Sequence, residues 1–510
     1  MHTTVTNSTA ANADVAVNDL SPLAWVLEEL RKSLESASKA LKRFSRDAEA
    51  ARGTDLAAID AIQLRTARQQ LHQAVGAMEM VGLPGPVLLL SAMETAVQKF
   101  LQLPDLCSPE AVEKIEFASF ALTEYLEGLL AEKPVSAVSL FPQYRDVQEM
   151  LQADRVHPAD LWTFEWQWNE PKLAAMPAAR QYDAAARTEL DQSVLQLMKG
   201  KSPQAGVVLR DLSLGFAAGQ TEKEPKVFWM VAAGYFDAIA HDLVGSDVYV
   251  RRAASRILLQ YATLAKGDSQ VSERLALDLL FFCAQAVGGR ASDTPALAAV
   301  RTAYGLSRFK PVDYEQVQFG RFDPALLMQA RKRIVAAKES WSSLCAGEVT
   351  KMKAVADQFS LVVESLRKLH EPSEPLALAL TDAVDVTVRS RKAPAVHLAM
   401  EVATAVLYLE AMFEDLDPSD PQLLARTSCL AERLEWVRNG GQPQPLEVWM
   451  EELYRRVSDK KTMGNVVNEL RVSLGELEKA LDLFFRNPKD KTELQAVPGQ
   501  LAQMRGVLSV

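Results

Sequence analysis

The stretch that decides the fold is LEELRKSLESASKALKRFSRD (27–47), which returns near the end of the chain as VNELRVSLGELEKALDLFFRN (467–487). Ten of the 21 positions are identical without a gap. A second pair, QLHQAVGAMEM (70–80) and QLAQMRGVLSV (500–510), extends the match. The first copy continues for two more helices, whereas the second stops mid-motif. We therefore expect a complete helical module at the start of the chain and a truncated copy, a helical hairpin over 458–510, at its end.

The first module is predicted to be an up-down bundle of four helices over 21–131. Its first helix begins at Ser21-Pro22, a capping residue followed by proline, and Ser108-Pro109 opens the fourth helix in the same way. Apolar residues at intervals of three and four mark the buried sides of the first two helices. They are Leu27, Leu30, Leu34, Ala37, Leu41 and Phe44, then Leu64, Ala67, Leu71, Ala74, Met78 and Val81.

The whole chain is interpreted as all-α, built from tandem four-helix-bundle modules. A more divergent copy is expected over 346–457, because AMEVATAVLYLE (399–410) is similar to AMETAVQKFL (92–101) and LAERLEWV (430–437) to LTEYLEGL (122–129). The remaining segments are a disordered tail (1–20), a connector (132–180) and a central helical domain (181–345). No stretch shows a convincing strand pattern.

Composition excludes several classes of protein. The net charge is −10 and the pI about 5.4, which argues against nucleic acid or an anionic membrane as the main partner. The four cysteines lie far apart without a CxxC pair, which favours a reduced, intracellular protein with no zinc site. No signal peptide and no membrane span are expected. No cofactor is indicated.

Helix 2 contains HQAVGAMEMVG (72–82), which resembles the motif of histidine phosphotransfer (HPt) domains. The resemblance places His72 at the phosphoacceptor position and Gly76 and Gly82 at the two glycines of the motif. Glu94 falls on the acid of the third-helix motif. The lysine that would hold the phosphoryl group is replaced by Val75.

The copy at the end of the chain lacks the histidine of the motif and keeps a cation. Ala502 replaces the histidine, whereas Arg505 retains a cation. In the copy over 346–457, the equivalent stretch is taken as LALALTDAV (376–384), which has no histidine. Each copy therefore lacks part of the phosphotransfer chemistry.

The order of several motifs resembles one family, the N-terminal region of large CheA-like hybrid histidine kinases of the ChpA/PilL type, which control type IV pilus twitching motility. FimL-like scaffold proteins share that region. The motifs are the run at 71–83, KPVSAVSLFPQYRDVQEM (133–150) and DRVHPADLW (154–162). The resemblance implies protein partners: response-regulator receiver domains, polar hub proteins and the rest of the kinase. It also implies a cytoplasmic location with recruitment to the cell pole.

Three functions are weighed. The first is a non-catalytic scaffold, since nothing in the chain matches a kinase ATP-binding core. The second is phosphotransfer through His72, and the third is a generic helical adaptor. The aromatic run LWTFEWQW (161–168) is expected to pack between domains, with a partner-binding patch as the alternative. KGKS (199–202) is interpreted as a turn between helices, not a phosphate loop.

Two further expectations concern particular segments. The scattered histidines are expected to be capping, packing or surface residues; they are His157, His241, His370 and His397. The helices at 461–486 and 498–508 are expected to expose an apolar face, because their partner helices are missing.

Overall fold

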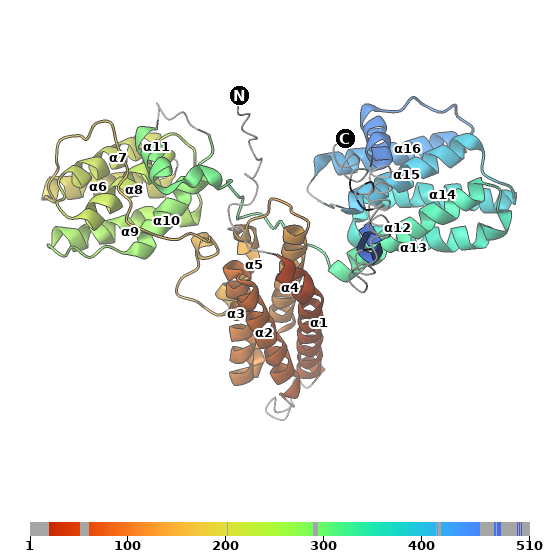
Figure 1. The fold of residues 1–510 in the computed structure, drawn as a ribbon, viewed down its shortest axis with the longest axis horizontal. Helices are drawn as coiled ribbons and strands as arrows, with labels where there is room; N and C mark the ends of the chain where they lie inside the picture. Colours follow the sequence, from red (N-terminus) through yellow and green to blue (C-terminus); the bar gives the residue numbers. More distant parts are fainter. Residues whose placement is uncertain are drawn as a thin grey trace. The chain divides into compact units, whose positions relative to one another are not determined.

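The computed structural model describes residues 20–50, 61–200, 202–288, 294–414, 416 and 420–459, with a few short stretches between 474 and 501. The described residues form α-helices, short 3-10 turns and loops, with no β-strand among them, so the chain is all-α (Figure 1). Contacts divide it into two compact units, 1–323 and 324–510. Most of the predicted terminal hairpin lies outside the described residues, including Ala502 and Arg505, so its expected apolar face is not tested; the tail before residue 20 lies outside them as well.

The first module contains five helices. They are α1 (Ser21–Ala50), α2 (Ile62–Val81), α3 (Pro84–Gln102), α4 (Pro109–Leu130) and α5 (Phe141–Met150). The expected apolar stripe of α1 is buried, and the hydroxyl of Ser108 accepts a hydrogen bond from the Ala111 amide at 3.2 Å as the N-cap of α4.

The packing order of these helices is a closed ring. α1 packs beside α2 and α4, α2 beside α3, and α5 against both α3 and α4. The predicted four-helix bundle over 21–131 is therefore incomplete, because its fifth helix comes from the segment 132–180 that was assigned to a connector. Its Phe141 and Val147 side chains are fully buried, which ties α5 to the core.

The central module repeats this order. Its helices are α6 (Ala184–Lys199), α7 (Pro203–Ala218), α8 (Lys223–Ala240), α9 (Val248–Ala265), α10 (Glu273–Gln285) and α11 (Pro295–Tyr304). α6 packs beside α7 and α9, α7 beside α8, and α10 against α8 and α9, while α11 is an addition that covers α8. α8 is consequently surrounded by helices, and its side chains are buried almost without interruption from Val227 to Ala238.

The second unit has the same ring once more. Its helices are α12 (Pro324–Cys345), α13 (Met352–Leu369), α14 (Glu374–Ser390), α15 (Val396–Glu414) and α16 (Pro421–Arg438). α12 packs beside α13 and α15, α13 beside α14, and α16 against α14 and α15. The boundary of this module therefore lies at 323/324, not at 345/346 as the sequence suggested, because α12 is its first helix.

This packing also corrects the expected alignment of the repeat. AMEVATAVLYLE (399–410) lies in α15, which occupies the place of α4 and not that of α3. Tyr125-Leu126-Glu127 of α4 then corresponds to Tyr408-Leu409-Glu410 of α15. The spacing of buried residues in α3 is found again in α14. The residues are Leu89, Ala92, Met93, Ala96 and Val97 in α3, and Leu376, Ala379, Leu380, Ala383 and Val384 in α14. The shared Ala-Met-Glu at 92–94 and 399–401 is a coincidence of composition.

α15 is long and apolar enough to cross a membrane by length and composition alone. In the structure it is a core helix, because it packs against α12 and α16 and more than half of its most apolar window is buried. It also carries a buried ion pair. Arg433 of α16 donates hydrogen bonds to both carboxylate oxygens of Glu401 at 2.8 and 3.0 Å, and to the carbonyls of Gln444 and Pro445.

We predict that Arg433→Ala destabilises the second unit by about 3–5 kcal/mol, because it leaves the Glu401 carboxylate buried without a partner. Hydrogen exchange of peptides from α15 and α16 measures this as lost protection. The control is Arg389→Ala, which removes an exposed pair with Asp385 and should change little. Equal effects of the two substitutions would contradict the assigned role of the buried pair.

Candidate functional site

His72 lies on the solvent side of α2, with 73% of its side chain exposed. Its Nδ1 is 3.1 Å from one carboxylate oxygen of Glu94 on α3 and 3.3 Å from the other. Arg68, one helical turn earlier on α2, has its Nε 3.8 Å from the same carboxylate. The structure thus brings together the histidine and the acid that the motif predicts, as a polar contact between two neighbouring helices.

The two glycines of the motif have different surroundings. Gly82 ends α2 with φ +79°, in the left-handed region, and its amide donates hydrogen bonds to the carbonyls of Met78 and Glu79. That position favours glycine for backbone reasons alone. Gly76 lies within the helix, and a Cβ built there would meet no atom within 4 Å. Packing within the chain therefore does not require glycine at position 76.

The position of the missing lysine faces the core. Val75 is only 8% exposed, so its side chain belongs to the buried side of α2. The nearest cation on the helix, Arg68, shares the Glu94 carboxylate. The Glu94 carboxylate contacts Nδ1 of His72, so it can orient the imidazole, and it leaves Nε2 as the ring nitrogen that would accept a phosphoryl group. The site offers an accessible imidazole in contact with an acid, but it lacks the motif's lysine at position 75.

The other modules show what occupies the same place. The second helix of each module has four buried residues at the same spacing. They are Ala67, Leu71, Ala74 and Met78 in α2; Ala205, Leu209, Leu212 and Phe216 in α7; and Val355, Phe359, Val362 and Leu366 in α13. The residue after Leu71 is His72, so its counterparts are Arg210 and Ser360. The stretch 376–384, taken from the sequence as the equivalent in the last module, lies in α14 and corresponds to α3.

In the central module the contact is purely structural. An Nη of Arg210 donates to Asp237 of α8 at 3.3 Å, and this carboxylate is fully buried. Asp237 also accepts hydrogen bonds from the amides of Ala296 and Leu297, both at 3.1 Å, and so caps the start of α11. A polar contact between the second and third helices thus recurs in two modules; the second helix contributes an imidazole in the first module and a guanidinium group in the central one.

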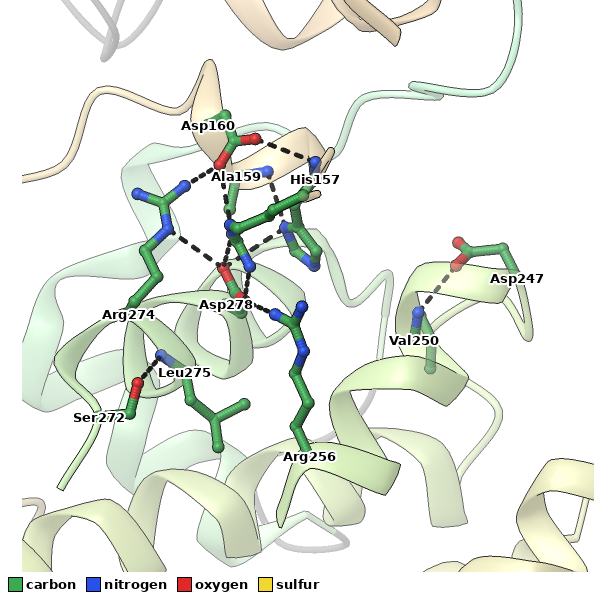
Figure 2. A network of polar contacts seen from close by, with 11 residues as sticks. His157, Ala159, Asp160, Asp247, Val250, Arg256, Ser272, Arg274, Leu275 and Asp278 are labelled. Carbon is green, nitrogen blue, oxygen red and sulfur yellow. Dashed lines mark hydrogen bonds and ion pairs between the residues drawn. The ribbon is translucent and has the colours of Figure 1, made fainter. Parts of the chain in front are cut away.

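A second polar cluster, which the sequence did not single out as a site, fixes residues 154–162 to the central module (Figure 2). Asp278 of α10 is 1% exposed, and Arg155 donates to both of its oxygens at 2.8 and 2.9 Å. Arg256 of α9 and Arg274 of α10 lie 3.6 and 3.9 Å from the same carboxylate. We call these residues, together with Asp160 and His157, the Asp278 cluster.

His157 is held neutral in this cluster. Burial lowers the pKa of its imidazole well below the ordinary value, and the positive charges of Arg155, Arg274 and Arg256 lower it further. Its Nδ1 accepts a hydrogen bond from the Ala159 amide at 3.1 Å, so Nδ1 carries no proton. The ring packs among the aromatic residues Tyr249, Phe281 and Phe282.

The aromatic run 161–168 continues along the central module. It has an extended backbone, with Trp162, Phe164, Trp166 and Trp168 turned inward and the residues between them exposed. Trp162 stacks on Phe164 and packs edge-on against Phe281, while Trp166 stacks on Tyr304. These contacts favour the packing interpretation of the run over an exposed partner-binding patch.

The other expected sites have structural roles where the structure describes them. Ser202 of KGKS caps α7 through the Ala205 amide, so this motif is a turn between α6 and α7. A ring nitrogen of His241 lies 2.9 Å from the Asp237 carbonyl, and His370 contacts Ser373 at 2.7 Å. Within the described ranges, no group of three or more His, Cys, Asp or Glu residues could hold a metal ion.

Comparison with known proteins gives a family match for the central module. Residues 175–317 match the model of a family described as the FimL scaffold protein second domain. The match begins before α6 and ends beyond α11, so it covers the second of the three modules that the described residues form. This part of the chain is a FimL-like scaffold region. No curated protein and no solved structure matches the chain.

We predict that the attachment of residues 154–162 weakens as the pH falls below about 6.5, the ordinary pKa of histidine. Below that pH, His157 binds a proton in the detached segment but stays neutral while it is buried, because burial lowers its pKa. Acid therefore favours the detached state of the segment. Hydrogen-exchange protection factors of these residues, measured at pH 7 and pH 5, should fall in the native chain.

His157→Asn removes this titration and retains an acceptor for the Ala159 amide, so its protection should change less with pH. The control is His397→Asn, at an exposed position, which should behave like the native chain. Unchanged protection of the native segment at pH 5 would contradict the prediction.

Proposed function

We propose that this chain is a non-catalytic scaffold of a chemotaxis-like two-component system that controls type IV pili and twitching motility. The observation that carries the proposal is the match of residues 175–317 to the FimL second domain. The module at this position shares its helix order with the modules on either side. Three modules of one topology, each with different exposed side chains, provide several binding surfaces in one chain.

The partners proposed are response-regulator receiver domains, polar hub proteins and the remainder of a kinase of the ChpA/PilL type. Binding would use exposed helix sides, as in other helix-to-groove contacts. We propose a cytoplasmic location with recruitment to the cell pole. No enzymatic activity is proposed for this chain.

Phosphotransfer through His72 is the second candidate. Two observations favour it: the imidazole is accessible, and the empty space beside Gly76 would allow a receiver domain to approach closely. The buried, apolar Val75 at the position of the motif's lysine opposes it. A generic helical adaptor without a motility role is the third candidate.

Incubation of the chain with a phosphorylated receiver domain distinguishes the first two candidates. We expect no acid-labile phosphate on the native chain, because Val75 replaces the lysine that would stabilise the phosphoryl group, and the neighbouring Arg68 is paired with Glu94. The matched variant is His72→Ala. Label on the native chain that this variant loses would establish phosphotransfer and refute a purely structural role for His72.

A motility assay tests the scaffold role itself. Deletion of the gene should abolish pilus-dependent spreading, and both the native gene and His72→Ala should restore it. Normal spreading of the deletion strain would favour the generic adaptor. If a folded His72→Ala protein failed to restore spreading, the imidazole would be required and the non-catalytic proposal would be wrong.

A further inference from the structure

The exposed side of α9 is unusually basic for this acidic chain. The helix contains Arg251, Arg252 and Arg256 but no Asp or Glu, whereas the whole chain has a net charge of −10. Arg252 is exposed, and the Arg256 side chain is 43% exposed. Leu259, one turn further on, is 71% exposed, a high value for leucine. Residues three and four apart share one side of a helix, so these side chains form a single surface.

Within the Asp278 cluster, the positive charges of the arginines are only partly neutralised by carboxylates. Its members are three arginines and two aspartates, and His157 is neutral, so the cluster carries an excess positive charge. Arg155 makes the two short hydrogen bonds to Asp278, and Arg274 pairs closely with Asp160. Arg256 approaches Asp278 only to 3.6 Å. Figure 2 shows the two side chains joined by a dashed line.

A guanidinium group has five N–H donors, and Arg256 directs part of its group to solvent. Arg252 lies one helical turn away on the same side of α9. Two guanidinium groups at this spacing can receive two carboxylates of one peptide segment, with charge-assisted hydrogen bonds. The apolar side chain of Leu259 beside them can bury a matching apolar residue.

We propose that this surface, Arg252, Arg256 and Leu259, binds an acidic segment of a partner protein that also carries an apolar residue. The inference names a partner class and a contact surface for the proposed scaffold and rests on that role. A short acidic segment is favoured over nucleic acid or an anionic membrane by charge. Large polyanions would be repelled by the net negative chain, whereas a short segment experiences mainly the local field within about 10 Å.

The experiment measures fluorescence anisotropy of a labelled peptide in which glutamates and leucines are placed at helical spacing, titrated with the full chain. A peptide with lysines in place of the glutamates is the probe control. We expect binding of the acidic peptide only. Arg252→Glu combined with Arg256→Gln should weaken it about tenfold or more, and added salt should weaken it further.

Leu259→Asp provides a second test that leaves the Asp278 cluster untouched, and it should also weaken binding. Arg187→Glu, at an exposed arginine of α6, is the matched control and should bind like the native chain. Thermal unfolding of each variant checks that the fold is retained.

The proposal is overturned if the native chain does not bind the acidic peptide, or if folded Arg252/Arg256 and Leu259 variants bind it as the native chain does. Binding of anionic vesicles or single-stranded DNA through these arginines, without peptide binding, would overturn it in favour of a polyanion. Dimerisation lost in the variants, again without peptide binding, would do so in favour of a second copy. The motility result is separate, so a failed peptide test leaves the scaffold proposal standing.

Discussion

The fifth helix of each module is the element on which the rest of the structure depends. In the first and last modules the third and fourth helices make little contact with each other, and the fifth helix packs against both. Without it, the apolar sides of α3 and α4 would face water along one edge of the bundle, at a cost of about 25 cal/mol for each Å² exposed. A four-helix description of this chain therefore omits the residues that close the core.

Closure by the fifth helix also directs the chain from the first module onto the central one. After α5 the chain does not leave as a free linker, because Arg155 and His157 contact Asp278 and Asp160 contacts Arg274, all within a dozen residues of the end of α5. The buried carboxylate of Asp278 makes this attachment specific, since a buried charge requires its partners. The adjoining aromatic run 161–168 adds apolar contacts along the same module.

Much of the fold could be predicted from local sequence. The three-four spacing predicted α1 and α2, and Ser108-Pro109 predicted the start of α4, because these signals act within one or two helical turns. The alignment of the last module failed, because Ala-Met-Glu at 92–94 and 399–401 matched while the packing neighbours were unknown. The Tyr-Leu-Glu match at 125–127 and 408–410 was also present in the sequence, but only contacts between helices show which match is meaningful.

Some features of the candidate site could likewise be predicted from local sequence, whereas others depend on packing. His72 and Glu94 came from a motif, and the structure places them in contact. The burial of Val75 and the open space beside Gly76 depend on which side of α2 faces the core. The Asp278 cluster joins residues more than one hundred positions apart, such as Arg155 and Asp278, so no local sequence pattern predicts it. His157 was expected to be a capping, packing or surface residue and is both capping and packed. The pKa of its imidazole is lowered first by burial and then by Arg155, Arg274 and Arg256, two of which are distant in sequence.

The ring order has an evolutionary consequence. Within a module the first helix contacts the second and fourth, and the fifth contacts the third and fourth, so the two ends of the module are not paired with each other. A duplicated module consequently brings its own closing helix, although α5 of the first module also contacts the central one, as Phe141 packs edge-on against Tyr249. Such a gene can grow or shrink by whole units, and the side chain at one helix position can differ from unit to unit, as it does at His72, Arg210 and Ser360.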